Sequence, residues 1–324
     1  MKNILLTGGL GYIGSKFFEL YSNVYNITIL DKNYFGNYLK NVNNLIVKDI
    51  RDLTLEDLSG LDAVVHMAEL SNDPLGELEP NLTNDINHIS TVNLLNLCNK
   101  AQVKKFIYMS SCSVYGFNEE IVNEDSNTNP LTSYSKAKVL NEDYILNNEF
   151  DFEISILRNA TVFGYSPNLR LDLVINDLTY GAFHDKKIIL LSDGTPVRPF
   201  VHVEDLSRLI SFLLGNKNPY QKEVINVGSN SMNFSIKQLA EFLSDYLKID
   251  DVIFGKADPD QRSYKVSFEK IENLFPSFQI SHNLNSGIID LIENFKKYED
   301  RIDSRRIMKI KSMIQQGLID NSLR

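Results

Sequence analysis

The sequence predicts an α/β protein in which a doubly wound parallel sheet is joined to a smaller, mixed α/β lobe. Short apolar runs alternate with helical patterns through the first half of the chain, and the connections are long enough for crossover helices. The first apolar run also passes directly into a glycine-rich turn. With 324 residues, of which 43% are hydrophobic, the chain can bury a core in each of two lobes.

Composition narrows the possible partners and the compartment. The net charge of -9 argues against a nucleic-acid surface, which would normally carry a basic stripe. Cys98 and Cys112 have no metal-binding spacing, so we expect no metal site and a reducing compartment. The first residues hold no apolar segment as long as a signal peptide or a membrane span. We therefore expect a cytoplasmic protein without a membrane partner.

The first predicted strand, Asn3 to Thr7, runs into the turn Gly8-Gly9-Leu10-Gly11-Tyr12-Ile13-Gly14, which opens a helix. Gly8 permits a tight turn, Gly11 lets the backbone approach a pyrophosphate, and Gly14 allows close helix packing. The helix N-terminus adds free N–H groups and positive potential. The context predicts a dinucleotide site, although the glycine pattern alone also fits an ordinary turn.

The second strand, Asn26 to Leu30, ends at Asp31, about 20 residues beyond the glycines, where a carboxylate can hold the adenosine ribose hydroxyls. A carboxylate there would repel a 2′-phosphate, so NAD is favoured over NADP. The neighbouring Lys32 is the one residue that weakens this preference.

Two further strands, Leu45 to Lys48 and Ala63 to His66, end at Asp49-Ile50 and at Met67-Ala68-Glu69. Ligands of open parallel sheets bind at the carboxyl ends of the strands. We therefore expect Asp49 and Ile50 to flank the adenine, and Met67 and Ala68 to lie against the cofactor. His66 is better interpreted as a packed strand residue than as a catalyst.

The chemically active residues follow the fifth strand, Lys105 to Met109, after a helix predicted over Asn81 to Lys100. The strand delivers Ser111, and Tyr134 and Lys138 then lie four residues apart on one helical face. A free tyrosine is only about 0.1% phenolate at pH 7, and lowering its pKa by roughly 3 units requires about 4 kcal/mol. A lysine ammonium and a nicotinamide ring in a partly dry cleft could supply this. The pattern predicts redox chemistry on an alcohol, although a Tyr and a Lys at this spacing also occur in ordinary helices.

Beyond Ser166-Pro167 the regular alternation loosens, which indicates a crossing into the second lobe. The predicted elements there are a helix over Arg170 to His184, a strand over Val224 to Val227 that returns to the sheet, and helices over Ile236 to Leu247 and Phe268 to Leu274, with Ser235 and Ser267 as their N-caps. The last segment has apolar residues at helical spacing (Ile307, Ile310, Met313 and Ile314), so we expect a helix packed on the body or on a partner.

Together these residues resemble the extended short-chain dehydrogenase/reductase family, specifically the NAD-dependent nucleotide-sugar epimerases and dehydratases, over about residues 1 to 295. The matching positions are Gly8, Gly11 and Gly14, Asp31, Asp49-Ile50, His66-Met67-Ala68, the buried Asn87, and the triad Ser111, Tyr134 and Lys138. The resemblance implies a Rossmann NAD-binding domain over 1–165 that also receives segments near 195–230, a nucleotide-sugar lobe over 166–295, and a helical tail over 296–324. It also implies cofactor contacts by Tyr12, Ile13, Lys32, Tyr134 and Lys138.

The departures from the family pattern bear on the reaction. The 4,6-dehydratases carry Thr-Asp-Glu where this chain has Ser111-Cys112-Ser113, and water elimination needs an acid and a base that Cys112 and Ser113 do not provide. We read Cys112 as a small buried residue. The favoured function is a nucleotide-sugar 4-epimerase, in which Tyr134 takes the proton of the 4-hydroxyl, hydride passes to NAD, and the keto sugar turns and accepts hydride on its other face.

Two alternatives stay open. A 4-dehydrogenase would release a 4-keto nucleotide sugar, and the run Arg170-Leu171-Asp172 with Asn176 is similar to heptose 4-dehydrogenases. A member of the fold that binds nucleotides without turnover is the other alternative, against which the intact triad argues.

Substrate contacts are implied at Ser113, Thr161, Asn176, Arg198 and Arg262. Arg198 matches an arginine that binds phosphate or ribose in relatives, and Arg262 matches a position that binds the diphosphate. Glu69 stands where Ala or Gly is typical, so it is either a substrate hydrogen-bond partner or a solvated carboxylate. Relatives usually pair through the helices that match Asn81 to Lys100 and Ser133 to Asn147, so we expect a homodimer.

Overall fold

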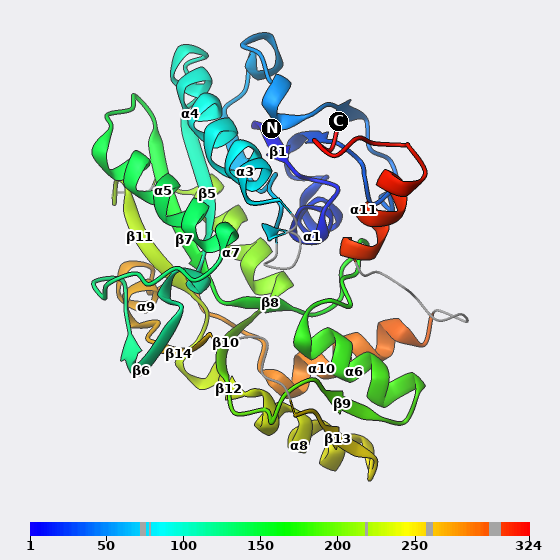
Figure 1. The fold of residues 1–324 in the computed structure, drawn as a ribbon. Helices are drawn as coiled ribbons and strands as arrows, with labels where there is room; N and C mark the ends of the chain where they lie inside the picture. Colours follow the sequence, from blue (N-terminus) through cyan, green and yellow to red (C-terminus); the bar gives the residue numbers. More distant parts are fainter. Residues whose placement is uncertain (72–75, 78, 218–219, 257–261, 298–305) are drawn as a thin grey trace.

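A computed structural model describes residues 1–71, 76–77, 79–217, 220–256, 262–297 and 306–324. The chain forms two lobes (Figure 1), the larger built on a parallel sheet and the smaller on short sheets with helices. This is the α/β class that the strand and helix alternation predicts.

The central sheet has seven strands in the order β11-β7-β5-β4-β1-β2-β3, and every neighbouring pair is parallel. The strands are β1 (Asn3–Thr7), β2 (Asn26–Asp31), β3 (Asn44–Val47), β4 (Ala63–His66), β5 (Lys105–Ser111), β7 (Glu153–Asn159) and β11 (Glu223–Val227). The predicted return of residues 224–227 to the sheet is confirmed. Strands β2 and β3 lie on one side of β1, and β4, β5, β7 and β11 lie on the other, so the strand order reverses between β1 and β4. Open α/β sheets bind ligands at such a switch point.

Helices cover both faces of this sheet. One face packs on α1 (Tyr12–Tyr21) and α7 (Val203–Gly215), and the other on α4 (Ser90–Lys100) and α5 (Ser133–Asn147). The pleat of β1 sends Ile4 and Leu6 into the first core cluster and Leu5 into the second, as the two-residue period of a strand requires. The site at the end of β1 therefore rests on strands that are buried on both faces.

The long helix predicted over Asn81 to Lys100 is interrupted. It forms α3 (Pro80–Asn84), a five-residue π turn over Asp85–Ile89, and then α4. The π turn places Asn87, which is fully buried, so that its amide accepts from Leu70 N at 2.8 Å and donates to Leu70 O at 3.2 Å. Apolar spacing cannot distinguish a π turn from an α-helix, and such turns often occur at functional sites.

Three short sheets lie beside the central one: β8 (Thr161–Phe163) with β10 (Val197–His202) and β12 (Asn233–Ser235); β9 (Ile188–Leu190) with β13 (Val252–Phe254); and β6 (Phe117–Val122) with β14 (Ser263–Val266). The sheet of β6 and β14 and helix α9 (Glu269–Leu274) contribute to the first core cluster, and α9 contacts β11. The helices of the smaller lobe are α6 (Val174–His184), α8 (Ile236–Leu247) and α10 (Leu284–Phe295). A third core cluster fills this lobe, with Phe163, Leu239 and Leu291 among its fully or almost fully buried members.

Two helix boundaries differ from the prediction. Helix α6 begins at Val174, not Arg170, because Arg170 pairs with Asp172 and Leu173 is extended. Ser267 is not the N-cap of α9, since Phe268 holds that position and Ser267 Oγ accepts only weakly from Glu269 N, at 3.4 Å. The predicted cap Ser235 is confirmed, with a reciprocal capping box to Gln238.

The C-terminal segment returns to the larger lobe. Helix α11 (Arg306–Gln315) lies near α1 in Figure 1, drawn in red, and its Ile310 is fully buried in the second core cluster. Ile319 and Leu323 join the same cluster. Residues 306–324 thus form part of the wall of the larger lobe.

Candidate active site and cofactor cavity

The glycine turn has the shape that its residues predict. Gly8 has φ +69°, and a Cβ on it would lie 2.8 Å from the Ala68 Cα. A Cβ on Gly14 would lie 2.6 Å from the Gly9 Cα, and one on Gly11 would lie 3.0 Å from the Gly8 carbonyl oxygen. Because Gly11 is also the residue that precedes α1, the turn brings bare backbone to a helix N-terminus, where an anion is favoured.

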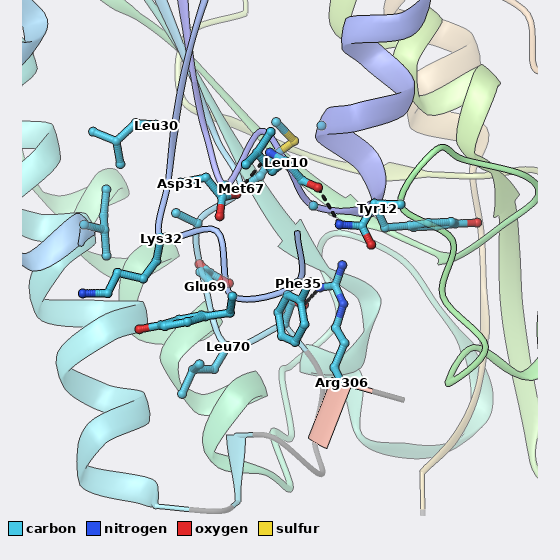
Figure 2. A pocket seen from close by; sticks show the side chains of 18 of the residues that line it. Leu10, Tyr12, Leu30, Asp31, Lys32, Phe35, Met67, Glu69, Leu70 and Arg306 are labelled. Carbon is cyan, nitrogen blue, oxygen red and sulfur yellow. Dashed lines mark hydrogen bonds between the residues drawn. The ribbon is translucent and has the colours of Figure 1, made fainter. Parts of the chain in front are cut away.

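A cavity opens beside this turn (Figure 2). The residues expected at the cofactor that line it are Gly8, Gly11, Tyr12, Ile13, Gly14, Asp31, Lys32, Asp49, Ile50, Met67 and Ala68. Glu69 lines the same cavity, and so do Tyr34, Phe35, Asn168, Arg170 and Arg306, which the sequence did not single out for this role.

Acidic side chains stand at the ends of β2 and β3. Asp31 accepts from Leu10 N at 3.1 Å and Asn33 N at 2.7 Å, and burial raises the pKa of its carboxyl. Asp49 forms two parallel hydrogen bonds with Arg51, at 2.9 and 2.7 Å. Although burial works to raise the pKa of Asp49, the bonds from Arg51 lower it overall. Through the hydrogen bond from Leu10 N, Asp31 connects the glycine turn to the end of β2.

His66 is a packed strand residue, as expected. Its two ring nitrogens lie 2.7 Å from the hydroxyls of Thr7 and Thr91. Burial lowers the pKa of His66 to about 3, so the ring stays neutral. The same Thr7 hydroxyl accepts from the backbone N–H groups of Met67 and Ala68 at 3.2 and 3.3 Å, which fixes the strand end that faces the cavity.

Lys138 is buried and Tyr134 lies one turn before it on α5, with the lysine nitrogen 5.3 Å from the tyrosine ring centroid. Helix α5 begins at Ser133 behind the N-cap Thr132, so the pair occupies its first turns. Lys138 Nζ donates to the carbonyl oxygen of Met109, two residues before Ser111 on β5. This contact brings Lys138, with Tyr134 one turn away, to the strand that delivers Ser111.

Glu69 forms an ion pair with Lys138, and both side chains are almost completely buried. Its second oxygen accepts from the Tyr108 hydroxyl at 3.2 Å, and Tyr108 in turn accepts from Asn141 at 2.8 Å. Burial raises the pKa of Glu69 and lowers that of Lys138, and the attraction between the two groups opposes both shifts. Glu69 is thus neither solvated nor free, because its carboxylate is committed to the lysine.

The short turn after β5 has no acid. Ser111 Oγ accepts from Ser113 N at 3.1 Å. Cys112 is buried, its thiol donates to the Arg158 carbonyl at 3.2 Å, and burial raises its pKa well above the ordinary value. Ser113 is buried, and its hydroxyl has no hydrogen-bond partner among the described residues.

Thr161, Arg198 and Arg262 are three of the residues that we expect to contact the substrate from the second lobe. Thr161 opens β8, opposite Phe200. Arg198 Nη1 donates to the Arg262 carbonyl oxygen, and its guanidinium lies 5.5 Å from the Tyr264 ring centroid. The structure therefore brings the two arginines together.

Asn176 is placed differently from the expectation of a diphosphate contact. It is fully buried, and its amide accepts from Gly164 N at 3.0 Å and donates to the Tyr12 hydroxyl at 3.2 Å and the Arg170 carbonyl at 3.0 Å. Because each of these partners is protein, Asn176 joins the two lobes and does not present its amide to a ligand.

The cavity fits a dinucleotide on structural grounds. The glycine cradle would be filled by any Cβ, and a buried guanidinium nitrogen of Arg306 faces it without a hydrogen-bond partner among the described residues. The profile of the family described as "NAD dependent epimerase/dehydratase family" matches residues 4–228 of this chain. The chain belongs to this family. It is an enzyme, and its cofactor is NAD.

Relatives in the family carry out more than one reaction. The UDP-glucuronate 4-epimerase of Thermodesulfobacterium geofontis is 28% identical over 257 residues, which cover 75% of this chain and 78% of the relative. The human dTDP-D-glucose 4,6-dehydratase is 28% identical over 266 residues, covering 76% and 74%. The crystal structure of the Thermotoga maritima UDP-glucose 4-epimerase with UDP-glucose superposes with a TM-score of 0.81 at 25% identity and covers 91% of this chain and 99% of that one. The comparisons therefore do not distinguish an epimerase from a dehydratase, and the residues of the site must do so.

Two other features bear on function. In the described parts of the chain, no helix combines the length and the apolar character needed to cross a membrane. His202, Glu204 and His282 lie close enough to share a cation. Each imidazole already has protein partners, since His202 lies 3.3 Å from Asp290 and His282 3.1 Å from Asp205. Hydrogen bonding within the protein therefore accounts for this cluster.

Proposed function

We propose that this enzyme is a nucleotide-sugar 4-epimerase. The observation that carries the proposal is the turn after β5, where the triad serine is followed by a buried, protonated Cys112 and by Ser113. Elimination of water requires an acid for the leaving hydroxyl and a base for the adjacent carbon. Since this turn supplies neither group, and the Glu69 carboxylate is paired with Lys138, the site supports removal and return of hydride without dehydration.

In the proposed mechanism, Tyr134 and Ser111 hold the 4-hydroxyl of the sugar, and Tyr134 removes its proton. Lys138 supports the tyrosinate electrostatically from one helical turn away. NAD would be held at the glycine turn and by Asp31, and it would supply the acceptor and donor of the C4 hydride. Tyr134 then gives the proton back after the 4-keto sugar has turned its other face to the cofactor. Arg198 and Arg262 are the proposed anchors of the diphosphate, about which the sugar turns.

Product analysis with C4-labelled substrates tests this function. Purified enzyme is incubated with UDP-glucose, UDP-N-acetylglucosamine and UDP-glucuronate deuterated at C4, and products are followed by proton NMR. We expect the C4 epimer with deuterium retained, and an activity loss of about 10²–10⁴-fold in Tyr134→Phe with nucleotide binding preserved. A keto sugar with an equal amount of NADH would instead identify the 4-dehydrogenase, and a 4-keto-6-deoxy product would identify a dehydratase.

We also propose that the enzyme is a cytoplasmic homodimer. The two cysteines are free and buried, as suits a reducing compartment. Ile89, in the π turn, and Leu140, in α5, expose 53% and 44% of their surface, and the π turn and α5 contact each other. Exposed apolar residues on neighbouring helices are typical of a subunit interface.

A further inference from the structure

A buried arginine from the C-terminal helix reaches the cofactor cavity. Arg306, the first residue of α11, is only 7% exposed and lines the cavity beside the glycine turn. Figure 2 shows its side chain beside Phe35, on the side of the cavity where Tyr12 lies. The residue lies outside the segment that the family profile matches.

The hydrogen bonds of Arg306 are incomplete. Nη1 donates to the Ser71 hydroxyl at 3.2 Å, and the guanidinium carbon lies 4.6 Å from the Phe35 ring centroid. Nη2 has no hydrogen-bond partner among the described residues. It lies 3.9 Å from the position that a Cβ on Gly11 would occupy. The free nitrogen therefore faces the turn whose backbone is shaped for a pyrophosphate.

The charges around Arg306 leave room for an anion. Arg170 is also buried in this cavity, and its guanidinium pairs with Asp172 at 2.8 and 3.1 Å. Burial and the charge of Arg170 lower the pKa of Arg306 to about 9, while Asp172 and Asp31 oppose this shift. Asp31 accepts from backbone N–H groups, and within the described parts of the chain Arg306 forms no ion pair. A buried cation of this kind is costly.

We propose that Arg306 binds the diphosphate of NAD from the side opposite the glycine turn, so that residues 306–324 complete the cofactor site. The proposal concerns the cofactor alone and holds whichever sugar is turned over. A nucleoside diphosphate group offers the paired anionic oxygens that a guanidinium binds best.

The rest of the segment holds Arg306 in this position. Ile310, one turn later, is fully buried. Leu323 O accepts from the Tyr34 hydroxyl and, at 3.4 Å, from Arg51 Nη2, and Arg324 donates to both oxygens of Asp52 at 2.8 and 2.7 Å. The segment is thus attached beside β2 and β3, at the adenosine end of the cavity.

The test compares Arg306→Met with Lys309→Met, which removes the same charge from an exposed position of the same helix. NAD, ADP and adenosine are titrated into NAD-free full-length protein by calorimetry, and UDP is titrated separately as the ligand of the substrate side. We expect Arg306→Met to weaken NAD and ADP by about tenfold or more and adenosine by less than about twofold, since a hydrogen bond to a charged group is lost. Arg306→Lys should recover part of the affinity, and Lys309→Met should bind all three as wild type does.

A second readout separates this role from simple packing. Because Arg306 is a buried cation without an ion pair among the residues that the structure describes, Arg306→Met should raise the Tm of the NAD-free protein while reducing the Tm increase that NAD produces. Wild-type affinity for NAD and ADP in Arg306→Met would overturn the proposal. Equal losses for adenosine and ADP would overturn it too, and so would a loss confined to UDP, which would assign Arg306 to the substrate diphosphate.

Discussion

Glu69 changes the electrostatic environment of the proposed general base. Its carboxylate pairs with Lys138, and the other titratable or charged groups near this pair are Tyr134, Glu142, Tyr108 and His66. A lysine whose charge is partly balanced by a carboxylate stabilises a tyrosinate less than a lone ammonium does. If Tyr134 is the base, the positive ring of bound NAD would have to supply more of the stabilisation of its anion.

Removing this carboxylate should make the base ionise at lower pH. In Glu69→Gln the negative charge near Tyr134 is lost while the side-chain shape is kept, so the tyrosinate is favoured. We expect the acidic limb of the pH profile of kcat/KM to move down by roughly one pH unit. The profile is measured from pH 5 to 9 with the preferred substrate. A shift toward higher pH would show that Glu69 acts mainly by keeping Lys138 protonated.

The residue scale also shows what the sequence could and could not predict. The glycines and Asp31 depend on local geometry and line one cavity, and the spacing of Tyr134 and Lys138 places both on one face of α5. The pairing of Glu69 with Lys138 could not be predicted, because this ion pair joins the end of β4 to a helix about 70 residues later. The burial of Asn176 depends likewise on Tyr12, in the other lobe.

At the scale of elements, hydrogen bonds between Asp205 of helix α7 and the segment before α10 include one to the titratable ring of His282. Asp205 accepts from the backbone N–H groups of Ser281 and His282 at 3.1 and 2.8 Å and from the His282 ring. The hydrogen bond to Asp205 raises the pKa of His282 above its ordinary value near 6.5, and Glu204 and Asp290 add to this. The His202 ring stacks on His282 with centroids 4.0 Å apart.

This contact should make stability depend on pH in a defined direction. Since the folded-state pKa of His282 is raised, its stabilisation is complete below about pH 6.5 and is lost as the pH rises through the folded-state pKa. His282→Gln should therefore lower the Tm at pH 6 by about 1–3 °C, and by less at pH 9, since the ring is partly exposed. Thermal denaturation at the two pH values checks this. An equal loss at both would mean that the charge of His282 contributes nothing.

Among the elements, strands were predicted more accurately than helix boundaries. The apolar runs of β1, β4 and β5 are bounded by residues that end strands, so their limits are nearly as expected. The π turn in the long helix and the late start of α6 depend on tertiary hydrogen bonds of Asn87 and Arg170, which carry no periodic signal.

At the scale of the whole molecule, the proposed dimer can be tested on its exposed apolar surface. The double variant Ile89→Glu with Leu140→Glu places charges on the helices of the proposed interface and should give monomers. Light scattering after gel filtration measures the mass. Leu191→Glu, at a 76% exposed residue of the other lobe, is the matched control and should remain dimeric. A monomeric wild type would contradict the proposal, and so would a dimeric double variant.

The cofactor site joins parts of the chain that are made at very different times. Gly8 and Gly11 leave the ribosome early, and the first strands can pair as soon as their partners follow. Arg306 and the residues that attach its helix emerge only after both lobes have been synthesised. If Arg306 supplies the second side of the diphosphate site, a nascent chain can hold NAD only weakly, and tight loading of the cofactor becomes one of the last steps in the maturation of the enzyme.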